Sequence, residues 1–417
     1  MTVTIPLSIA IIGAGLGGLA TARTLQQRRI AVTVFELEPS ASSRNQGGTL
    51  DVHPESGQLA LRSNGLWDTI ADKIRYEGQD ITIADKHGKI WLENKSNHGP
   101  REEEEAQAQD QGKKEEASRP APGFDRPEID RGVLRQTYLD SLEPGTIRWG
   151  VKVTQILPAS PTATSGESKH TLVLDNGTHE SFDVVVGADG AWSRVRSLLS
   201  PAKPLYSGVT MFETHLYHVN RTHPKAALTV GHGSLYALAD NKGMGAQRNG
   251  DGSIRTYVML RIPEANVPIF TAASVADNRA YILQQFLDWT DKYTDLVRLG
   301  TEMIPRPIYA LDPAHQWETV RGITLVGDAA HLMSPFAGEG ANLALLDGLE
   351  LGQALVKVVE EGLDLGTVQE AFEKTMLARS RFAAEISAAN IDNFLHVNAP
   401  AVTIEAVQKL MAGPPGQ

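Results

Sequence analysis

Cysteine is absent from the sequence, although the chain runs to 417 residues. Without a thiol, the protein can form no disulfide, no thiolate metal site and no cysteine nucleophile. Its 12 histidines show neither the His-x-His nor the His-Glu-x-x-His spacing of common metal sites. We therefore expect no bound metal.

Long hydrophobic runs are also missing. No segment approaches the roughly 20 uninterrupted apolar residues that a membrane-spanning helix needs, and the apolar run 7–12 reaches glycines too soon for a signal peptide. The net charge of −11 disfavours nucleic acid and acidic membrane surfaces as partners. These absences predict a soluble, cytoplasmic protein, and we expect it to be a monomer.

The N-terminal residues have the pattern of one βαβ unit. Residues 7–12 predict a buried strand, residues 19–27 a helix, and residues 31–35 a second strand that ends on Glu36. An acidic residue at that place can accept hydrogen bonds from a ribose hydroxyl.

Glycines fill the turn between the first strand and the helix. Gly13 allows a tight backbone turn, Gly15 lets a pyrophosphate approach the main chain, and Gly18 lets the helix pack closely on the strand. The pattern predicts binding of an adenine dinucleotide, for which NAD and FAD both fit; the alternative is a tight turn without a ligand.

Later segments predict a larger sheet and a second lobe. Residues 182–186 and 323–326 are short apolar runs that end in glycine and aspartate, as buried strands of a parallel sheet do. Residues 210–219 and 253–262 alternate partly between apolar and polar residues, which is typical of a sheet covered on one face. The tail 363–411 has helical periodicity.

Three further motifs carry a family resemblance. The motifs are VVVGADGAWSRVR at residues 184–196, GDAAH followed by Pro335 and GEGAN at residues 327–342, and DRGVLR at residues 130–135. They resemble the Asp-Gly motif, the second flavin motif and the arginine-bearing helix of the group A flavoprotein monooxygenases, the family of para-hydroxybenzoate hydroxylase.

A closer likeness is to the tetracycline destructase branch of that family. Residues 47–53, 124–129 and 327–338 look like its motifs. In the substrate lobe, that branch carries glutamine, arginine and histidine near the places where this chain has Glu213, Ser234 and Arg255. Many relatives also have arginine where Leu37 stands.

The resemblance implies an α/β fold with a doubly wound, Rossmann-type FAD-binding domain, interleaved with a mixed-sheet substrate domain and followed by a C-terminal helix. We expect the FAD-binding domain at 1–75, 124–204 and 303–365, the substrate domain at 76–94 and 205–302, a disordered insertion at 95–123, and the helical segment at 366–417.

The resemblance also implies an extended FAD whose ribityl chain meets Asp328, and whose ring lies at the positive end of a helix that begins near Gly340. The expected cofactor residues are Gly13, Gly15, Gly18, Glu36, Arg44, Arg131, Arg135, Asp189, Asp328, Pro335, Gly338, Gly340, Ala341 and Asn342. The expected substrate residues are Phe336, Glu213 and Arg255. Asp189 has an alternative role as a helix cap, and we interpret His331 as a core residue; no catalytic residue is assigned.

The implied reaction uses NADPH or NADH, bound transiently, to reduce FAD. One atom of O₂ then passes to an electron-rich carbon of an aromatic or polycyclic phenol, with a tetracycline-like antibiotic among the candidates. The alternatives are a flavin-dependent halogenase or reductase on the same scaffold, and a non-catalytic flavin-binding protein. The sequence lacks the Trp-x-Trp-x-Ile-Pro segment of halogenases, and offers no clear acid-base pair for an NAD-dependent dehydrogenase.

Overall fold

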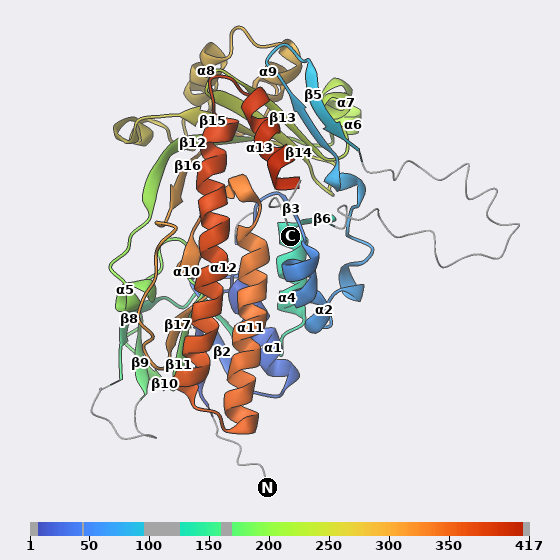
Figure 1. Ribbon diagram of the computed structural model, residues 1–417. Coiled ribbons are helices and arrows are strands. Elements are labelled where there is room, and N and C mark those ends of the chain that lie inside the picture. The colour runs from blue at the N-terminus through green and yellow to red at the C-terminus, as the bar shows by residue number, and fades with distance from the viewer. Residues whose placement is uncertain (1–6, 44–45, 96–125, 160–168, 412–417) are drawn as a thin grey trace, which may run out of the picture.

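The computed structural model describes residues 7–43, 46–95, 126–159 and 169–411 (Figure 1). Arg44 and residues 96–123 of the expected insertion therefore lie outside the described residues.

A five-stranded parallel sheet forms the centre of one lobe, with the strand order β17-β11-β1-β2-β7. Its strands are β1 (Ile9–Ile12), β2 (Val32–Glu36), β7 (Ile147–Trp149), β11 (Val184–Gly187) and β17 (Ile323–Leu325). All residues of β1, β11 and β17 are buried, which explains why their sequences are almost continuously apolar. The predicted βαβ unit and parallel sheet are confirmed.

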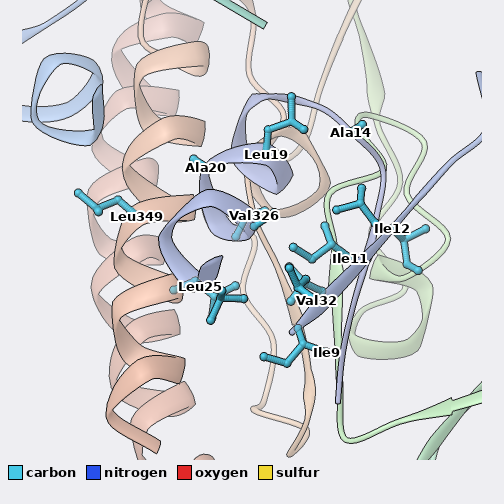
Figure 2. Packing of buried hydrophobic residues seen from close by; sticks show 14 of the residues in the cluster. Ile9, Ile11, Ile12, Ala14, Leu19, Ala20, Leu25, Val32, Val326 and Leu349 are labelled. Carbon is cyan, nitrogen blue, oxygen red and sulfur yellow. The ribbon is translucent and has the colours of Figure 1, made fainter. Parts of the chain in front are cut away.

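Two helices pack together against this sheet. Helix α1 (Leu16–Gln27) lies between β1 and α11 (Gly340–Glu361), and its Leu19 and Leu25 belong to the same buried cluster as the strands (Figure 2). A β-carbon at Gly348 of α11 would lie only 2.3 Å from the carbonyl oxygen of Gly17. Glycine is therefore required for the two helix backbones to approach so closely.

An antiparallel meander, which the sequence pattern did not predict, packs in the same core. It comprises β8 (Val153–Leu157), β9 (His170–Leu174) and β10 (His179–Phe182). Phe182 at its end meets Phe35 of β2 edge to face, with 5.8 Å between the ring centroids.

The second lobe is built on a seven-stranded sheet with the order β16-β12-β15-β14-β13-β4-β5. The strands are β4 (Ile81–Ala84), β5 (Ile90–Asn94), β12 (Leu205–Leu216), β13 (Ser234–Ala239), β14 (Lys242–Arg248), β15 (Ile254–Arg261) and β16 (Ile304–Ala310). All neighbours pair antiparallel except β13 and β4. The expected mixed sheet is confirmed.

The two faces of this sheet have different partners. Phe212 and Val258 point to the face that the helices α7 (Pro224–Val230), α8 (Val275–Gln285) and α9 (Asp291–Arg298) cover. Met211 and Met259, one residue along, point to the face that packs on the C-terminal helices.

The expected strand 210–219 differs from the observed β12 at both ends. The strand begins earlier, at Leu205, and stops at Leu216. His218 has a left-handed backbone (φ 52°), and the short helix α6 (Val219–Thr222) follows it, so the chain leaves the sheet before Val219.

The C-terminal part is helical, as expected. Helix α12 (Leu365–Phe394) runs alongside α11 and reaches the seven-stranded sheet, and α13 (Ala401–Met411) follows it (Figure 1). The predicted α/β fold with C-terminal helices is thus confirmed. Within the described ranges, no helix is both long and apolar enough to cross a membrane.

Short elements complete the two lobes and the region between them. They are the ribbon of β3 (Thr49–Asp51) and β6 (Glu128–Asp130), the helices α2 (Leu59–Ser63), α4 (Arg131–Asp140), α5 (Arg196–Leu199) and α10 (Asp328–His331), the π-helix Pro54–Gln58, and the 3-10 helices Asp68–Ile70, Glu77–Gln79, Glu264–Ile269 and Pro335–Ala337. The candidate site lies among them.

Candidate active site

The glycine turn before α1 has the geometry that an anion-binding turn needs. Gly13 has a φ of 103°, and a β-carbon there would lie 2.3 Å from the carbonyl oxygen of Ala188. A β-carbon on Gly18 would lie 2.5 Å from the carbonyl oxygen of Gly13. Gly15 caps α1 without any side chain, so the first N–H groups of the helix are open to a phosphate.

Glu36 and Arg135 hold this turn from two sides. The carboxylate of Glu36 accepts hydrogen bonds from the backbone N–H of Ala14 at 2.6 Å and of Glu38 at 2.9 Å. The buried Arg135 donates from Nε to the carbonyl oxygen of Ala14 and from Nη1 to that of Ala41, each at 3.1 Å. Glu36 is thus fixed at the end of β2, where a ribose contact is expected, and Arg135 braces the turn.

Asp189 caps a turn with one carboxylate oxygen, and its role toward a cofactor stays a prediction. One carboxylate oxygen accepts the backbone N–H of Arg194 at 2.8 Å, while Oδ1 is buried and has no partner among the described residues. A buried oxygen without a donor is costly, so this atom fits a hydroxyl of a bound cofactor. The helix after it, α5, begins at Arg196 rather than at Ser193, whose hydroxyl accepts the N–H of Arg196 at 2.9 Å.

Asp328 is exposed at the start of α10, beyond the carboxyl end of β17, and its carboxylate has no hydrogen-bond partner among the described residues. The turn that carries it is held by the buried Asp347 of α11, which accepts the N–H of Gly327 at 3.0 Å and contacts Nε2 of His331 at 2.6 Å. Burial alone would raise the pKa of Asp347, but the contacts with His331 and Arg379 lower it below the usual range. His331 therefore lies in the core, as interpreted.

The loop before α11 is joined to the end of β3 through Asn342. The amide of this fully buried side chain donates to the carbonyl oxygen of Asp51 and accepts the N–H of His53, each at 2.9 Å. Because the side chain is fully buried, a cofactor contact at Asn342 would have to use the main chain. Gly340 and Ala341 form the first turn of α11, whose N–H groups face the same loop.

His53 connects the same two segments by charge. Its buried ring lies with Nε2 2.8 Å from a carboxylate oxygen of Asp51 and Nδ1 3.4 Å from one of Glu339. Burial alone would lower the pKa of His53, but these two carboxylates raise it to about 9. His53 is therefore an imidazolium at neutral pH.

This charge predicts a pH dependence of stability. The folded pKa of about 9 lies above the ordinary value of 6.5, so the stabilisation is complete below about pH 6.5 and is lost as the pH rises through 9. The two carboxylates are partly exposed, so we expect screening to leave on the order of 1–2 kcal/mol. Between about pH 7 and pH 10, the unfolding free energy of wild type should fall by that much more than that of His53→Gln. Denaturant titrations measure it, and parallel pH profiles would contradict the assignment.

A turn with two glycines, Gly47 and Gly48, lies between α4 and the seven-stranded sheet. A β-carbon on Gly47 would lie 3.2 Å from Cδ of Arg131, and one on Gly48 would lie 3.1 Å from Cδ of Arg255 and 3.3 Å from the hydroxyl of Tyr257. Large side chains at either position would fill this junction.

The sheet beside this turn presents a charged end and an aromatic end. Glu213, expected as a substrate residue, is buried and lies in an ion pair with Arg255. At the aromatic end, Phe394 of α12 meets Tyr236 at 5.5 Å and Phe336 at 5.6 Å between ring centroids. Burial raises the pKa of Tyr236 to about 12, which keeps its phenol neutral.

The loop that carries Pro335, Phe336 and Gly338 is fixed to α12. The amide of Asn390 donates to the carbonyl oxygen of Phe336 at 3.0 Å, and the hydroxyls of Ser334 and Ser387 are 2.6 Å apart. Helix α12 thus positions the loop between α10 and α11.

The expected residues fall into three groups in space. Gly13, Gly15, Gly18, Glu36 and Arg135 gather at the first glycine turn. Near the lobe junction lie Arg131, Phe336, Gly338, Gly340, Ala341, Asn342, Glu213 and Arg255. Asp189 and Asp328 lie at the ends of the neighbouring strands β11 and β17.

Five site residues lack any individual signal in the sequence. They are His53, Glu128, Tyr236, Tyr257 and Arg306. Burial raises the pKa of Glu128, which accepts the hydroxyl of Thr49 at 2.6 Å, to about 8. His53 belongs to the motif at residues 47–53 and Glu128 to the motif at residues 124–129, so only those two could have been found from the sequence.

The family described as FAD binding domain matches residues 7–366. Monooxygenase penA of Penicillium thymicola is 29% identical over 427 residues, which cover 92% of each protein.

Solved structures share the fold. HpxO of Klebsiella pneumoniae, crystallised with FAD and uric acid, has a TM-score of 0.73 at 19% identity and covers 97% of this chain and 93% of its own. The tetracycline destructase Tet(51) has a TM-score of 0.67 at 18% identity, with 98% and 96% covered.

Proposed function

Since the chain belongs to the FAD binding domain family, and within it to the group A flavin-dependent monooxygenases, we propose that it hydroxylates an aromatic or polycyclic phenol. FAD is its cofactor, and NAD(P)H is the typical reductant of the family. When bound, the flavin supplies the redox chemistry and the activation of O₂.

The residues present fit this cofactor from end to end. We assign the pyrophosphate to the N–H groups at the start of α1 and the ribose to Glu36. The ribityl chain is assigned to the carboxylate of Asp328, which has no hydrogen-bond partner among the described residues, with Oδ1 of Asp189 just beyond the end of the neighbouring strand β11. The ring edge is assigned to the first turn of α11, where the positive helix end favours negative charge.

One observation carries the hydroxylase proposal. The Gly47–Gly48 turn, the loop before α11 and the aromatic face of the seven-stranded sheet meet at the lobe junction. Side chains there are held by α12 and by paired charges, so they can orient a ring and exclude water from the oxygen-transfer site.

A tetracycline is the second candidate substrate. The likeness of residues 47–53 and 327–338 to the destructase branch favours it. Glu213, Ser234 and Arg255 differ from the residues of that branch which grip the antibiotic, so we place simpler phenols first.

The proposal predicts three results for the purified protein. It should show the absorbance of bound FAD, oxidise NADPH or NADH faster in the presence of a suitable phenol, and yield a product heavier by one oxygen atom in mass spectrometry. A panel of phenols, polyphenols and tetracycline covers the candidates. Bound FAD that no member of the panel brings to turnover would favour a non-catalytic flavin-binding protein.

A further inference from the structure

The sheet face at the lobe junction is divided by chemistry. Met211, Met259 and Leu238 form an apolar cluster with the aromatic side chains described above. Further along the same strands lie Glu213 and Arg255, on the same face by strand alternation.

The charged end is centred on one carboxylate. Only 5% of the Glu213 side chain is exposed. One of its carboxylate oxygens lies 2.9 Å from Nε2 of His215 and accepts a hydrogen bond from Nη1 of Arg255. The other oxygen accepts a hydrogen bond from Nε of Arg306 at 2.8 Å. Burial alone would raise its pKa, but these three groups lower the pKa of Glu213 to about 2. Glu213 is therefore ionised at every physiological pH.

Arg255 and Arg306 are consequently both paired with this carboxylate from inside the protein. Arg255 is buried and ion-paired, and Arg306, whose side chain is 53% exposed, directs its Nε inward to the same carboxylate. The second ring nitrogen of His215 lies 3.1 Å from a carboxylate oxygen of Glu302, which adds another negative charge at the rim. Glu302 thus contacts His215, and Glu213 is the carboxylate that Arg255 and Arg306 share.

We infer that the substrate is an uncharged, ring-rich compound, and that Glu213 determines this preference by occupying the arginines that would otherwise bind a carboxylate. The inference rests on the proposed function, because it takes this face as the substrate site. Arginine binds carboxylates through paired N–H groups, and Arg255 already directs its guanidinium to Glu213. A carboxylate on the substrate would also lie beside the charge of Glu213, and such like-charge contacts are costly.

A matched pair of ligands tests this inference by binding alone. 2-Naphthol and 3-hydroxy-2-naphthoate share one ring system and differ by a carboxylate, and both fluoresce. Titrated into the FAD-bound protein, 2-naphthol should bind about tenfold or more tightly than the naphthoate, since about 1.4 kcal/mol of charge discrimination corresponds to tenfold.

Glu213→Gln should abolish most of the preference. The substitution keeps the shape and leaves Arg255 and Arg306 without the carboxylate that they share, so the naphthoate should bind about tenfold more tightly than to wild type. The affinity for 2-naphthol should stay within about threefold. Glu302→Gln is the matched control, because it removes a carboxylate from the exposed rim of the same cluster and should change neither affinity by more than about threefold.

A double variant separates charge from misfolding. Glu213→Gln/Arg255→Met removes one arginine together with the carboxylate, so the gain in naphthoate affinity should disappear while circular dichroism stays native. Wild type that prefers the naphthoate, or Glu213→Gln without a gain, would overturn the inference. Failure of both ligands to bind any variant would also overturn the inference, even if another phenol were hydroxylated. Binding of the ligands without hydroxylation of any phenol would instead count against the proposed function alone.

Discussion

Asp328→Ala is expected to weaken FAD binding about tenfold to a hundredfold, the range that the loss of a charged hydrogen bond gives. The carboxylate of Asp328 is exposed and has no hydrogen-bond partner among the described residues. Its removal therefore breaks no hydrogen bond among the described residues, and the turn is held by Asp347 and His331 instead. The loss should fall on the cofactor alone.

Titration of the apoprotein with FAD, followed by flavin fluorescence, measures this effect. Asp328→Asn keeps the shape and one acceptor, so its affinity should lie between those of wild type and the alanine variant. Glu318→Ala, which also removes an exposed carboxylate, should bind FAD like wild type. Unchanged binding in Asp328→Ala would show that the ribityl chain lies elsewhere.

Gly13→Ala is expected to lower the unfolding free energy by at least about 3 kcal/mol and to abolish FAD binding. The added methyl group would lie 2.3 Å from the carbonyl oxygen of Ala188, and the residue would have to keep a φ of 103°. Gly13 and Ala188 directly follow the last paired residues of β1 and β11. Neither backbone can therefore move away without disturbing the pairing of these strands.

Chemical denaturation of purified protein measures the loss of stability. Gly132→Ala is the matched control, because Gly132 lies in α4 with no atom within 4 Å of the added methyl and no positive φ. Since alanine favours the helix, that variant should be more stable by roughly 0.5–1 kcal/mol. Equal stability of the two alanine variants would mean that the first turn is not as tight as described.

The fold was largely predictable because its signals are local. Gly13, Gly18 and Glu36 stand within one βαβ unit, where strand, turn and helix each leave a pattern in adjacent residues. The end of β12 at Leu216 was placed wrongly, because the left-handed backbone of His218 has no signature in the sequence. The meander β8–β10 was missed for a similar reason, since its short strands alternate only weakly.

The site was predictable only where motifs mark it. The roles of Asp328 and Asp189 as cofactor residues came from the family resemblance and stay predictions. The three groups around Glu213 could not be foreseen, because Arg255 and Arg306 lie on different strands, 42 and 93 positions away. Which cation meets which carboxylate depends on the register of β12 with β15 and β16, and the sequence of one strand does not contain that register.

A crystal structure of the protein with FAD would test the central claim most directly. The account predicts one extended cofactor, with its pyrophosphate at the start of α1, its ribityl chain at Asp328 and its ring between the Gly47–Gly48 turn and the first turn of α11. The ring should face the sheet that carries Tyr236 and Glu213. An FAD ring bound away from this junction, or a nicotinamide nucleotide bound in its place, would contradict the account.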